Sequence, residues 1–270
     1  MIYCKTKDEI ELIRKSSLLV SDTLAMLAGI LRPGMSTLDL DKQAENFIRD
    51  HGGVPSFKGY RNFPNTLCTS VNDQVVHGIP NAKELRDGDV VSVDCGVFMN
   101  GFHGDSAYTF LLGPVPEEVV MLARVTKESV FKGIEMAVVG NRVGDISFAV
   151  QQYTEHEHGY GVVRELVGHG LGRELHEEPE VPNFGGRGRG PKLLDGMVIA
   201  IEPMINLGGR QVVQENDGWT IRTRDGKASC HFEHTIAVGK GSADILSDFE
   251  RIETAERKNS NIYTEQEITH

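Results

Sequence analysis

Apolar residues near the start of the chain recur at the spacing of one helix face. The residues that carry this pattern are Ile10, Ile13, Leu24, Leu27 and Leu31. Thr6 followed by Glu9 has the sequence of a capping box, and Pro33-Gly34 breaks the pattern. The pattern therefore predicts a helix from about Lys7 to Leu31 that opens a folded domain.

Three further helices are expected from periodicity and from the glycines that end them. They cover about residues 36–53, 117–139 and 145–159. Thr37 and Asp145 are plausible N-caps for the first and last of these three helices.

Two β-branched stretches share one pattern. Residues 85–94 read L-x-D-G-x-V-V-S-V-D and residues 193–202 read L-x-D-G-x-V-I-A-I-E. In each, an Asp-Gly turn starts a strand that ends on a carboxylate, Asp94 or Glu202, and the offset is 202 − 94 = 108 residues. Thr37 and Asp145 have the same offset, 145 − 37 = 108. The alternative is a chance alignment of two Asp-Gly turns.

The order helix, helix, strands thus occurs twice. It predicts an α+β fold in which helices cover one face of a mostly antiparallel sheet. We expect one catalytic domain over residues 1–246, made of pseudo-two-fold halves of about residues 5–112 and 113–240. The charged tail, residues 247–270, has few large apolar residues and is expected to be peripheral or disordered.

Composition narrows the class of protein. The 270 residues include 39 acidic and 28 basic side chains, and a net charge of -11 disfavours dedicated nucleic-acid binding or adhesion to anionic membranes. Four cysteines without a C-x-x-C pair indicate reduced thiols and a cytosolic setting. The apolar run from Leu18 to Leu31 contains Asp22, which argues against a signal peptide or a membrane span.

Acidic residues fall where the expected strands would bring them together. Asp94 ends one strand and Asp105 starts the next, and Asn100-Gly101 between them is a hairpin signal. The second half offers an equivalent pair, Glu202 and Glu233. Pseudo-symmetry would gather all four carboxylates at one central place.

Four carboxylates inside a sheet repel one another, so protons or metal must neutralise them. Carboxylates with one imidazole suit a pair of divalent first-row ions bridged by water. His169, with glycines on both sides in G-H-G-L-G, is the best imidazole candidate. His77 and His176, each the first residue of an H-x-x-P motif, are candidates for oxyanion contact or proton transfer.

Each of these residues also has a simpler interpretation. An Asp after a strand is usually a turn residue, and a lone His is more often a satisfied polar group than a ligand. The tract G-G-R-G-R-G at residues 185–190 resembles an RNA-binding tract, but in an acidic protein it is expected to be a flexible surface loop. The repeat favours the metal hypothesis because both copies place an acid at the same strand end.

A family resemblance adds to this interpretation. The set Asp94, Asp105, His169, Glu202 and Glu233, in this order, resembles the five-ligand dinuclear centre of the methionine aminopeptidases. The similarity rests on S-V-D-C-G, G-D-S-A, G-H-G-L-G-x-x-x-H, I-E-P and F-E-H-T, and it covers about residues 5–240. It implies the pita-bread fold of peptidase family M24. The chain has no long insertion between His169 and Glu233, so it resembles the short bacterial type I form.

The resemblance implies a role for each site residue. Asp105 and Glu233 would bridge two metal ions, His169 and Glu202 would complete the coordination of one, and Asp94 would chelate the other. Glu202, His77 and His176 would be the catalytic residues. The implied methionine pocket consists of Tyr60, Phe63, Cys68, His77, Leu175, His176 and Trp219. Phe57, Phe63 and Leu175 depart from the residues common in bacterial relatives but keep the pocket apolar.

The implied activity is removal of the initiator methionine from nascent proteins whose second residue is small. A hydroxide bridging two ions of Co, Mn, Fe or Zn would attack the scissile carbonyl. A cytoplasmic monomer is the family default, and the loop with Arg187 and Arg189 is a candidate for transient ribosome contact. Two alternatives stay open: an Xaa-Pro aminopeptidase or prolidase, which usually has an extra N-terminal domain, and a non-catalytic pita-bread module, which typically lacks metal ligands.

Overall fold

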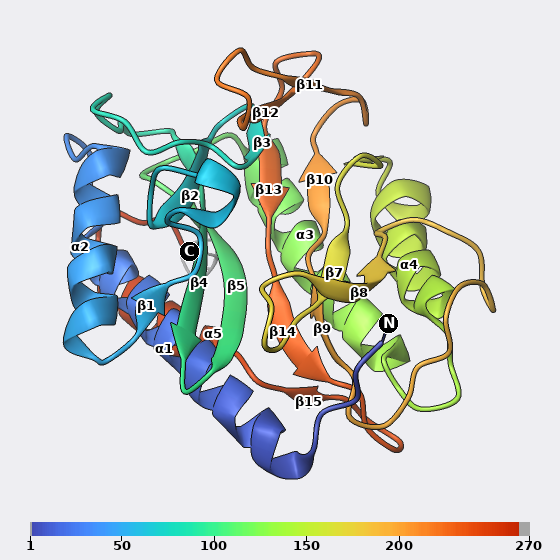
Figure 1. Cartoon of the computed structure of the whole chain (residues 1–270). Helices are drawn as coiled ribbons and strands as arrows, with labels where there is room; N and C mark the ends of the chain where they lie inside the picture. Colours follow the sequence, from blue (N-terminus) through green and yellow to red (C-terminus); the bar gives the residue numbers. More distant parts are fainter. Residues whose placement is uncertain (1, 265–270) are drawn as a thin grey trace.

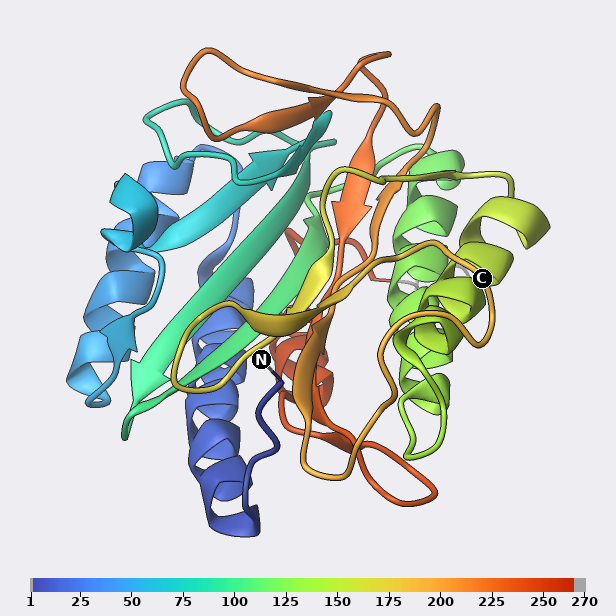
Figure 2. The same cartoon turned by 45° about the vertical axis from the view of Figure 1, so that its right-hand side comes forward.

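Strands form the centre of the molecule, and helices flank them on both sides (Figure 1). The computed structural model describes residues 2–264. In both views α1 and α2 lie on one side of the strands and α3 and α4 on the other (Figure 2). The helices are α1 Lys7–Ile30, α2 Thr37–Asp50, α3 Glu117–Met136, α4 Val143–Gln151 and α5 Phe249–Glu256, with the 3₁₀ turn η1 Tyr60–Asn62 and the π-helical η2 Gln152–Glu157.

The strands pair in antiparallel fashion, as the sequence predicts. One sheet has the order β15-β14-β9-β7-β8, and in another β4 pairs with β5 on one side and with β1 and β2 on the other. Two three-stranded sheets have the orders β13-β10-β6 and β11-β12-β3. The strands are β1 Val54–Pro55, β2 Leu67–Val71, β3 Gln74–Val76, β4 Val90–Met99, β5 Phe102–Leu111, β6 Gly161–Val162, β7 Gly168–Gly170, β8 Glu177–Val181, β9 Val198–Ile201, β10 Met204–Asn206, β11 Val212–Gln214, β12 Ile221–Thr223, β13 Ser229–His231, β14 His234–Ala237 and β15 Asp244–Ile245.

Helix α1 begins and ends where the sequence predicts. Thr6 caps it in a capping box with Glu9, and Leu31 is its C-cap. The helix packs closely against β5 at Gly104, where a Cβ would lie 2.3 Å from the backbone nitrogen of Ser17. Only glycine permits this approach, so the G-D-S-A motif fixes the helix-to-strand distance next to Asp105.

The N-caps expected at Thr37 and Asp145 are wrong. Helix α2 is capped by Ser36, whose side chain accepts a hydrogen bond from the backbone of Asp39. In α4 the N-cap is Arg142, and Asp145 accepts a hydrogen bond of 2.8 Å from the Arg142 backbone N–H. In both helices the acidic residue three positions after the N-cap accepts a hydrogen bond from the N-cap backbone.

The C-terminal segment is not peripheral over its described length. Helix α5 packs against α1, and Phe249, Ile252 and Ile262 are buried in the main core. Few apolar residues occur in this segment, but these three face the core together, so the composition of the segment does not predict its position. The last part of the predicted tail, residues 265–270, lies outside the described residues.

The hairpin signal at Asn100-Gly101 is confirmed, but both strands are longer than expected. Met99, the last residue of β4, pairs with Phe102, the first residue of β5. The two-residue turn between them consists of Asn100 and Gly101, with φ of 55° and 83°. Asp94 and Asp105 therefore lie inside their strands rather than at the ends. A continuous ladder through both residues holds them more rigidly than strand ends would.

Side-chain hydroxyls join β5 to the β13–β14 segment, two pieces of chain that lie side by side (Figure 1). Ser106 Oγ donates to the carbonyl of Glu233 at 2.6 Å, and Thr235 Oγ1 donates to the carbonyl of Asp105 at 2.7 Å. Thr109 Oγ1 donates to the carbonyl of His231 at 2.7 Å. We refer to these contacts between β5 and residues 231–235 as the central seam.

Two further observations concern the helices and the cysteines. Among residues 2–264, no helix combines the length and hydropathy that crossing a membrane requires. The four cysteines at positions 4, 68, 95 and 230 are all free thiols.

Candidate metal centre

One cavity contains every residue that the sequence assigned to the site. It has a volume of about 260 Å³, with the acidic residues in one part of its wall and aromatic and aliphatic residues in another. The assigned residues that line it are Tyr60, Phe63, Cys68, His77, Asp94, Asp105, His169, Leu175, His176, Glu202, Trp219 and Glu233. Phe57, Arg61 and Met204 also line it.

Strand register explains how the four carboxylates meet. Asp94 pairs with Ala107 and Asp105 pairs with Gly96, so the two aspartates occupy diagonal positions on one face of the β4–β5 pair. Glu202 follows β9 directly, and Glu233 precedes β14, which pairs with β9 through His234 and Ile201. The central seam then holds Glu233 beside β5.

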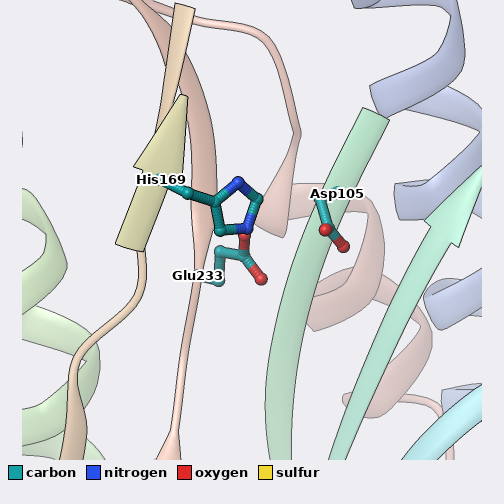
Figure 3. Close-up of side chains that lie close together, drawn as sticks. All are labelled: Asp105, His169 and Glu233. Atoms are coloured by element: carbon teal, nitrogen blue, oxygen red, sulfur yellow. The ribbon is translucent and has the colours of Figure 1, made fainter. Parts of the chain in front are cut away.

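His169 completes a compact group of possible ligands. One ligand atom each of Asp105, His169 and Glu233 lies within 4.8 Å of the others. In Figure 3 the imidazole and the two carboxylates converge on one space. The Nδ1 of His169 lies 2.9 Å from the carbonyl of Gly170, and its Nε2 lies 3.5 Å from Glu202 Oε1. The ring thus turns Nε2 toward the carboxylates.

Glycines allow β7 to approach its neighbours at this point. A Cβ at Gly168 would lie 2.4 Å from the carbonyl oxygen of Ala200, and one at Gly170 would lie 2.4 Å from that of Glu178. The glycines that flank His169 are therefore required for the strand to pack between β8 and β9.

The carboxylates are strongly destabilised as anions. Burial raises the pKa of Asp94 to about 7, although the nearby His231 opposes this shift. Burial also raises the pKa of Glu202 to about 7 against the effect of His169. Burial and the charge of Asp94 hold the pKa of Asp105 well above its usual range, and burial and Asp105 do the same for the pKa of Glu233.

The residues fit a cationic group. Three carboxylate oxygens, Asp94 Oδ1, Asp105 Oδ1 and Glu233 Oε1, are buried and lack a hydrogen-bond partner within residues 2–264. A native structure rarely leaves such atoms unpaired. Hard oxygen ligands with one imidazole match divalent first-row ions, so the donor set supports a metal site without further polar groups.

The two other assigned histidines lie in the same cavity in neutral form. Burial lowers the pKa of His77 to about 4, and the nearby His231 makes a smaller contribution in the same direction. Desolvation lowers the pKa of His176 to about 3, and the neighbouring His169 adds to this effect. Tyr60 Oη lies 2.9 Å from His176 Nδ1, and the two rings stack with centroids 5.2 Å apart.

An apolar cluster forms another part of the cavity wall. Phe57, Phe63, Cys68 and Leu175 are buried together, and Trp219 packs edge-on against Phe63 with centroids 5.1 Å apart. Burial raises the pKa of the Cys68 thiol well above its usual range, so this side chain remains a neutral part of the wall.

One residue near the carboxylates was missed. His231, on β13, is buried, and its Nε2 lies 3.5 Å from Glu202 Oε2. The sequence S-C-H-F-E places it two residues before Glu233, and this spacing to a predicted ligand is the signal that could have found it.

Comparisons with known proteins agree with this geometry. The family model described as metallopeptidase family M24 matches residues 11–240. The chain is 54% identical over 247 residues to the methionine aminopeptidase of Clostridium perfringens. The aligned residues cover 92% of this chain and 99% of that relative. The crystal structure of methionine aminopeptidase from Thermotoga maritima superposes with a TM-score of 0.90 at 41% identity, over 92% of this chain and all of that one.

A more distant structure shows the fold alone. The Xaa-Pro dipeptidase of Bacillus anthracis superposes with a TM-score of 0.73 at 20% identity, over 91% of this chain and 62% of that one. The similarity therefore extends to a fold that hosts more than one peptidase activity.

Proposed function

The chain belongs to metallopeptidase family M24 and has the pita-bread fold, and from this we propose that it is a methionine aminopeptidase. The observation that carries the proposal is that five potential metal ligands and an apolar cluster line the same cavity. An unbranched thioether side chain suits the apolar wall, while the scissile bond of the same residue would lie at the carboxylates.

The proposed ligands are those that the family resemblance implies. Asp105 and Glu233 would be shared by two divalent ions, His169 and Glu202 would complete one site, and Asp94 would complete the other. Bound there, the ions would neutralise the carboxylates, polarise a carbonyl and lower the pKa of a water between them. Co, Mn, Fe and Zn all suit this donor set.

His176 is placed to donate to the substrate carbonyl. Its low pKa keeps the ring neutral, and a neutral imidazole has one donor and one acceptor nitrogen. If Tyr60 Oη donates to Nδ1, the proton of His176 is on Nε2. This tautomer presents an N–H to the cavity, where it can stabilise negative charge developing on oxygen.

Glu202 is the proposed proton carrier and His77 the contact to the scissile amide. Asn183 Nδ2 donates to the carbonyl of Glu202 at 3.0 Å, which fixes the backbone of Glu202 next to β9. His77 lies in the cavity with its ring edge-on to Trp219 at 6.0 Å between centroids.

The finer features of the function are proposals as well. We propose nascent polypeptides with a small second residue as substrates, a cytoplasmic monomer as the working form, and transient ribosome contact through Arg187 and Arg189, which are exposed. We also propose pseudo-symmetric halves over residues 5–112 and 113–240 within one catalytic domain. This domain extends past the boundary expected at residue 246, because Phe249, Ile252 and Ile262 lie in the main core. The matching Asp-Gly turns support the halves, since Gly88 and Gly196 have φ of 91° and 83°.

A peptide assay with controlled metal tests the activity. Protein stripped with EDTA is expected to be inactive, and Mn²⁺, Fe²⁺ or Co²⁺ added under anaerobic conditions should restore cleavage of Met-Ala-Ser. Metal analysis of anaerobically purified protein identifies the resident ion. Glu202→Ala should abolish turnover and leave the circular dichroism spectrum unchanged.

Three outcomes contradict the proposal in different ways. Preference for Xaa-Pro peptides over Met-Ala-Ser would identify a proline-directed hydrolase. No bound metal and no cleavage with any added ion would favour a non-catalytic binding module. Near-wild-type turnover by Glu202→Ala would refute the role of this residue.

A further inference from the structure

His231 is a buried imidazole whose outer nitrogen is unsatisfied. The residue is 1% exposed, and its Nε2 has no hydrogen-bond partner within the part of the chain that the structure describes. Buried polar atoms are nearly always paired, so an unpaired one beside an acidic cluster calls for an explanation.

The backbone of His231 is held firmly. Its carbonyl accepts a hydrogen bond of 2.7 Å from Thr109 Oγ1, and its N–H donates to the same oxygen at 3.0 Å. On its other side β13 pairs with β10, where His231 lies opposite Met204. Both neighbouring segments thus determine where the ring points, and His231 is not among the residues that line the cavity.

The carboxylate of Glu202 lies between two imidazoles, one at each oxygen. His169 Nε2 is 3.5 Å from Oε1, and His231 Nε2 is 3.5 Å from Oε2. The two histidines differ in position, because His169 lines the cavity with the other proposed ligands and His231 lies outside the set of lining residues. One oxygen therefore faces the proposed metal ligands, and the other faces a buried donor.

We propose that His231 is a positioning residue for Glu202: its Nε2–H donates a hydrogen bond to Oε2, so that Oε1 stays directed toward His169 and the other proposed metal ligands. This inference rests on the proposed function, because it assigns His231 to the support of a proposed ligand. A hydrogen bond to the far oxygen of a ligating carboxylate restricts its rotation and fixes its basicity, and the loss of such a support typically weakens metal binding 10–100-fold.

Two substitutions at one position separate positioning from packing. His231→Leu introduces an apolar side chain of similar size and removes the donor, whereas His231→Gln keeps an N–H at a similar distance from the backbone. We expect His231→Leu to weaken Mn²⁺ binding about 10–100-fold, measured from the electron paramagnetic resonance signal of free Mn²⁺. His231→Gln should recover most of that affinity. For Met-Ala-Ser, kcat should fall in His231→Leu while KM changes little.

A second readout does not depend on catalysis. The rise in Tm on adding Mn²⁺ reports binding to the folded chain. It should shrink in His231→Leu and return in His231→Gln. The matched control is His234→Leu, at a position as buried as His231, whose ring stacks on Phe249 with centroids 3.6 Å apart and whose Nδ1 pairs with Ser247 at 2.6 Å. This variant should lose thermal stability and retain its affinity for Mn²⁺.

The outcomes distinguish the two claims. Equal Mn²⁺ affinity in wild type, His231→Leu and His231→Gln, with a lower Tm, would overturn the positioning role and leave a packing role. If His231→Leu does not fold, His231→Asn replaces it, because its amide is too short to reach Glu202, and affinity equal to His231→Gln would again overturn the inference. Wild-type protein that binds none of Mn²⁺, Fe²⁺, Co²⁺ and Zn²⁺ would refute the proposed function itself, before any variant is compared.

Discussion

The hydroxyl of Ser106 donates a 2.6 Å hydrogen bond to the main-chain carbonyl of Glu233. Ser106 follows Asp105 in β5, and Glu233 lies 127 residues further along the chain, so this one bond joins the backbones of two proposed metal ligands. The reciprocal bond from Thr235 Oγ1 to the carbonyl of Asp105 has a length of 2.7 Å. The central seam therefore sets the distance between carboxylates that come from remote parts of the sequence.

Ser106→Ala should affect both stability and metal affinity. Removal of a buried hydrogen bond costs about 1 kcal/mol of unfolding free energy. Because the bond also positions Glu233, we expect weaker Mn²⁺ binding. Urea denaturation and Mn²⁺ titration measure the two effects on the same protein.

Ser129→Ala is the matched control for this substitution. Ser129 is buried, and its hydroxyl donates at 2.7 Å to the carbonyl of Thr126 within α3, so this bond is not part of the central seam. A similar loss of stability with unchanged Mn²⁺ affinity is expected there. If the two variants bind Mn²⁺ equally well, the seam does not position the ligands.

Without metal, repulsion among the four buried carboxylates should lower the unfolding free energy of the protein. Asp105→Asn removes one of four mutually repelling carboxylates. We expect its unfolding free energy in EDTA at pH 8 to exceed that of the wild type, because burial and the charge of Asp94 disfavour the ionised form of Asp105. The same substitution should abolish the rise in Tm that Mn²⁺ gives. Thermal melts with and without metal measure both effects.

Asp41 provides the opposite case in the same fold. It is also buried, but its carboxylate accepts hydrogen bonds from the backbone N–H groups of Thr66 and Leu67, at 2.8 and 2.9 Å. Asp41→Asn should therefore lower stability, with or without metal. A stabilising effect at Asp41, or a destabilising one at Asp105, would contradict the charge-repulsion argument.

The sequence predicted most of the site because the relevant signals are local or repeated. The turn at Asn100-Gly101 fixes the register of β4 and β5, and this register determines where Asp94 and Asp105 meet. Glu202 ends a strand that the 108-residue offset marks independently. Local turn chemistry and a repeated pattern are therefore sufficient to predict three of the carboxylates from the sequence.

The errors arose where tertiary packing decides. Only contact with α1 shows that three apolar residues of the C-terminal segment belong to the core. His231 was missed because its importance depends on a distance of 3.5 Å to Glu202 across two strands. The seam through Ser106 is similar, since a serine in a strand has no signal of its own until its partner is known.

The shape of the apolar wall should control which N-terminal residue is accepted. Leu175 is 2% exposed and packs in the cluster with Phe57, Phe63 and Cys68. Leu175→Ala would enlarge the pocket, and the lost contact should lower kcat/KM for Met-Ala-Ser about 10–100-fold. Cleavage of a peptide with a larger apolar first residue, such as Phe-Ala-Ser, should fall less or increase. The ratio of the two kcat/KM values measures the change in specificity.

Leu246→Ala controls for the loss of a buried leucine. Leu246 is fully buried in a separate cluster with Ile13 and Phe102. Its truncation should cost about 2–5 kcal/mol of stability and leave the ratio of Met-Ala-Ser to Phe-Ala-Ser cleavage unchanged. If both variants shift this ratio equally, Leu175 does not contribute to specificity.

A buried carboxylate outside the site should add its own pH dependence to stability. Glu256 on α5 is 9% exposed, and Tyr108 Oη donates to its Oε2 at 3.0 Å. Burial raises the pKa of Glu256 to about 7, although the bond from Tyr108 and the charge of Lys127 oppose the shift. The folded protein therefore binds this proton more tightly than the unfolded chain, in which the pKa is about 4.5.

The contribution of Glu256 to stability should accordingly be complete below about pH 4.5 and lost as the pH rises through 7. Glu256→Gln retains an acceptor for Tyr108 and cannot ionise. The unfolding free energy of this variant relative to wild type should therefore increase between pH 5 and pH 8, by up to about 3 kcal/mol. Urea denaturation in EDTA at both pH values measures the difference, in which the titration of the site carboxylates cancels. A difference between variant and wild type that is the same at both pH values would show that burial does not disfavour the ionised form of Glu256.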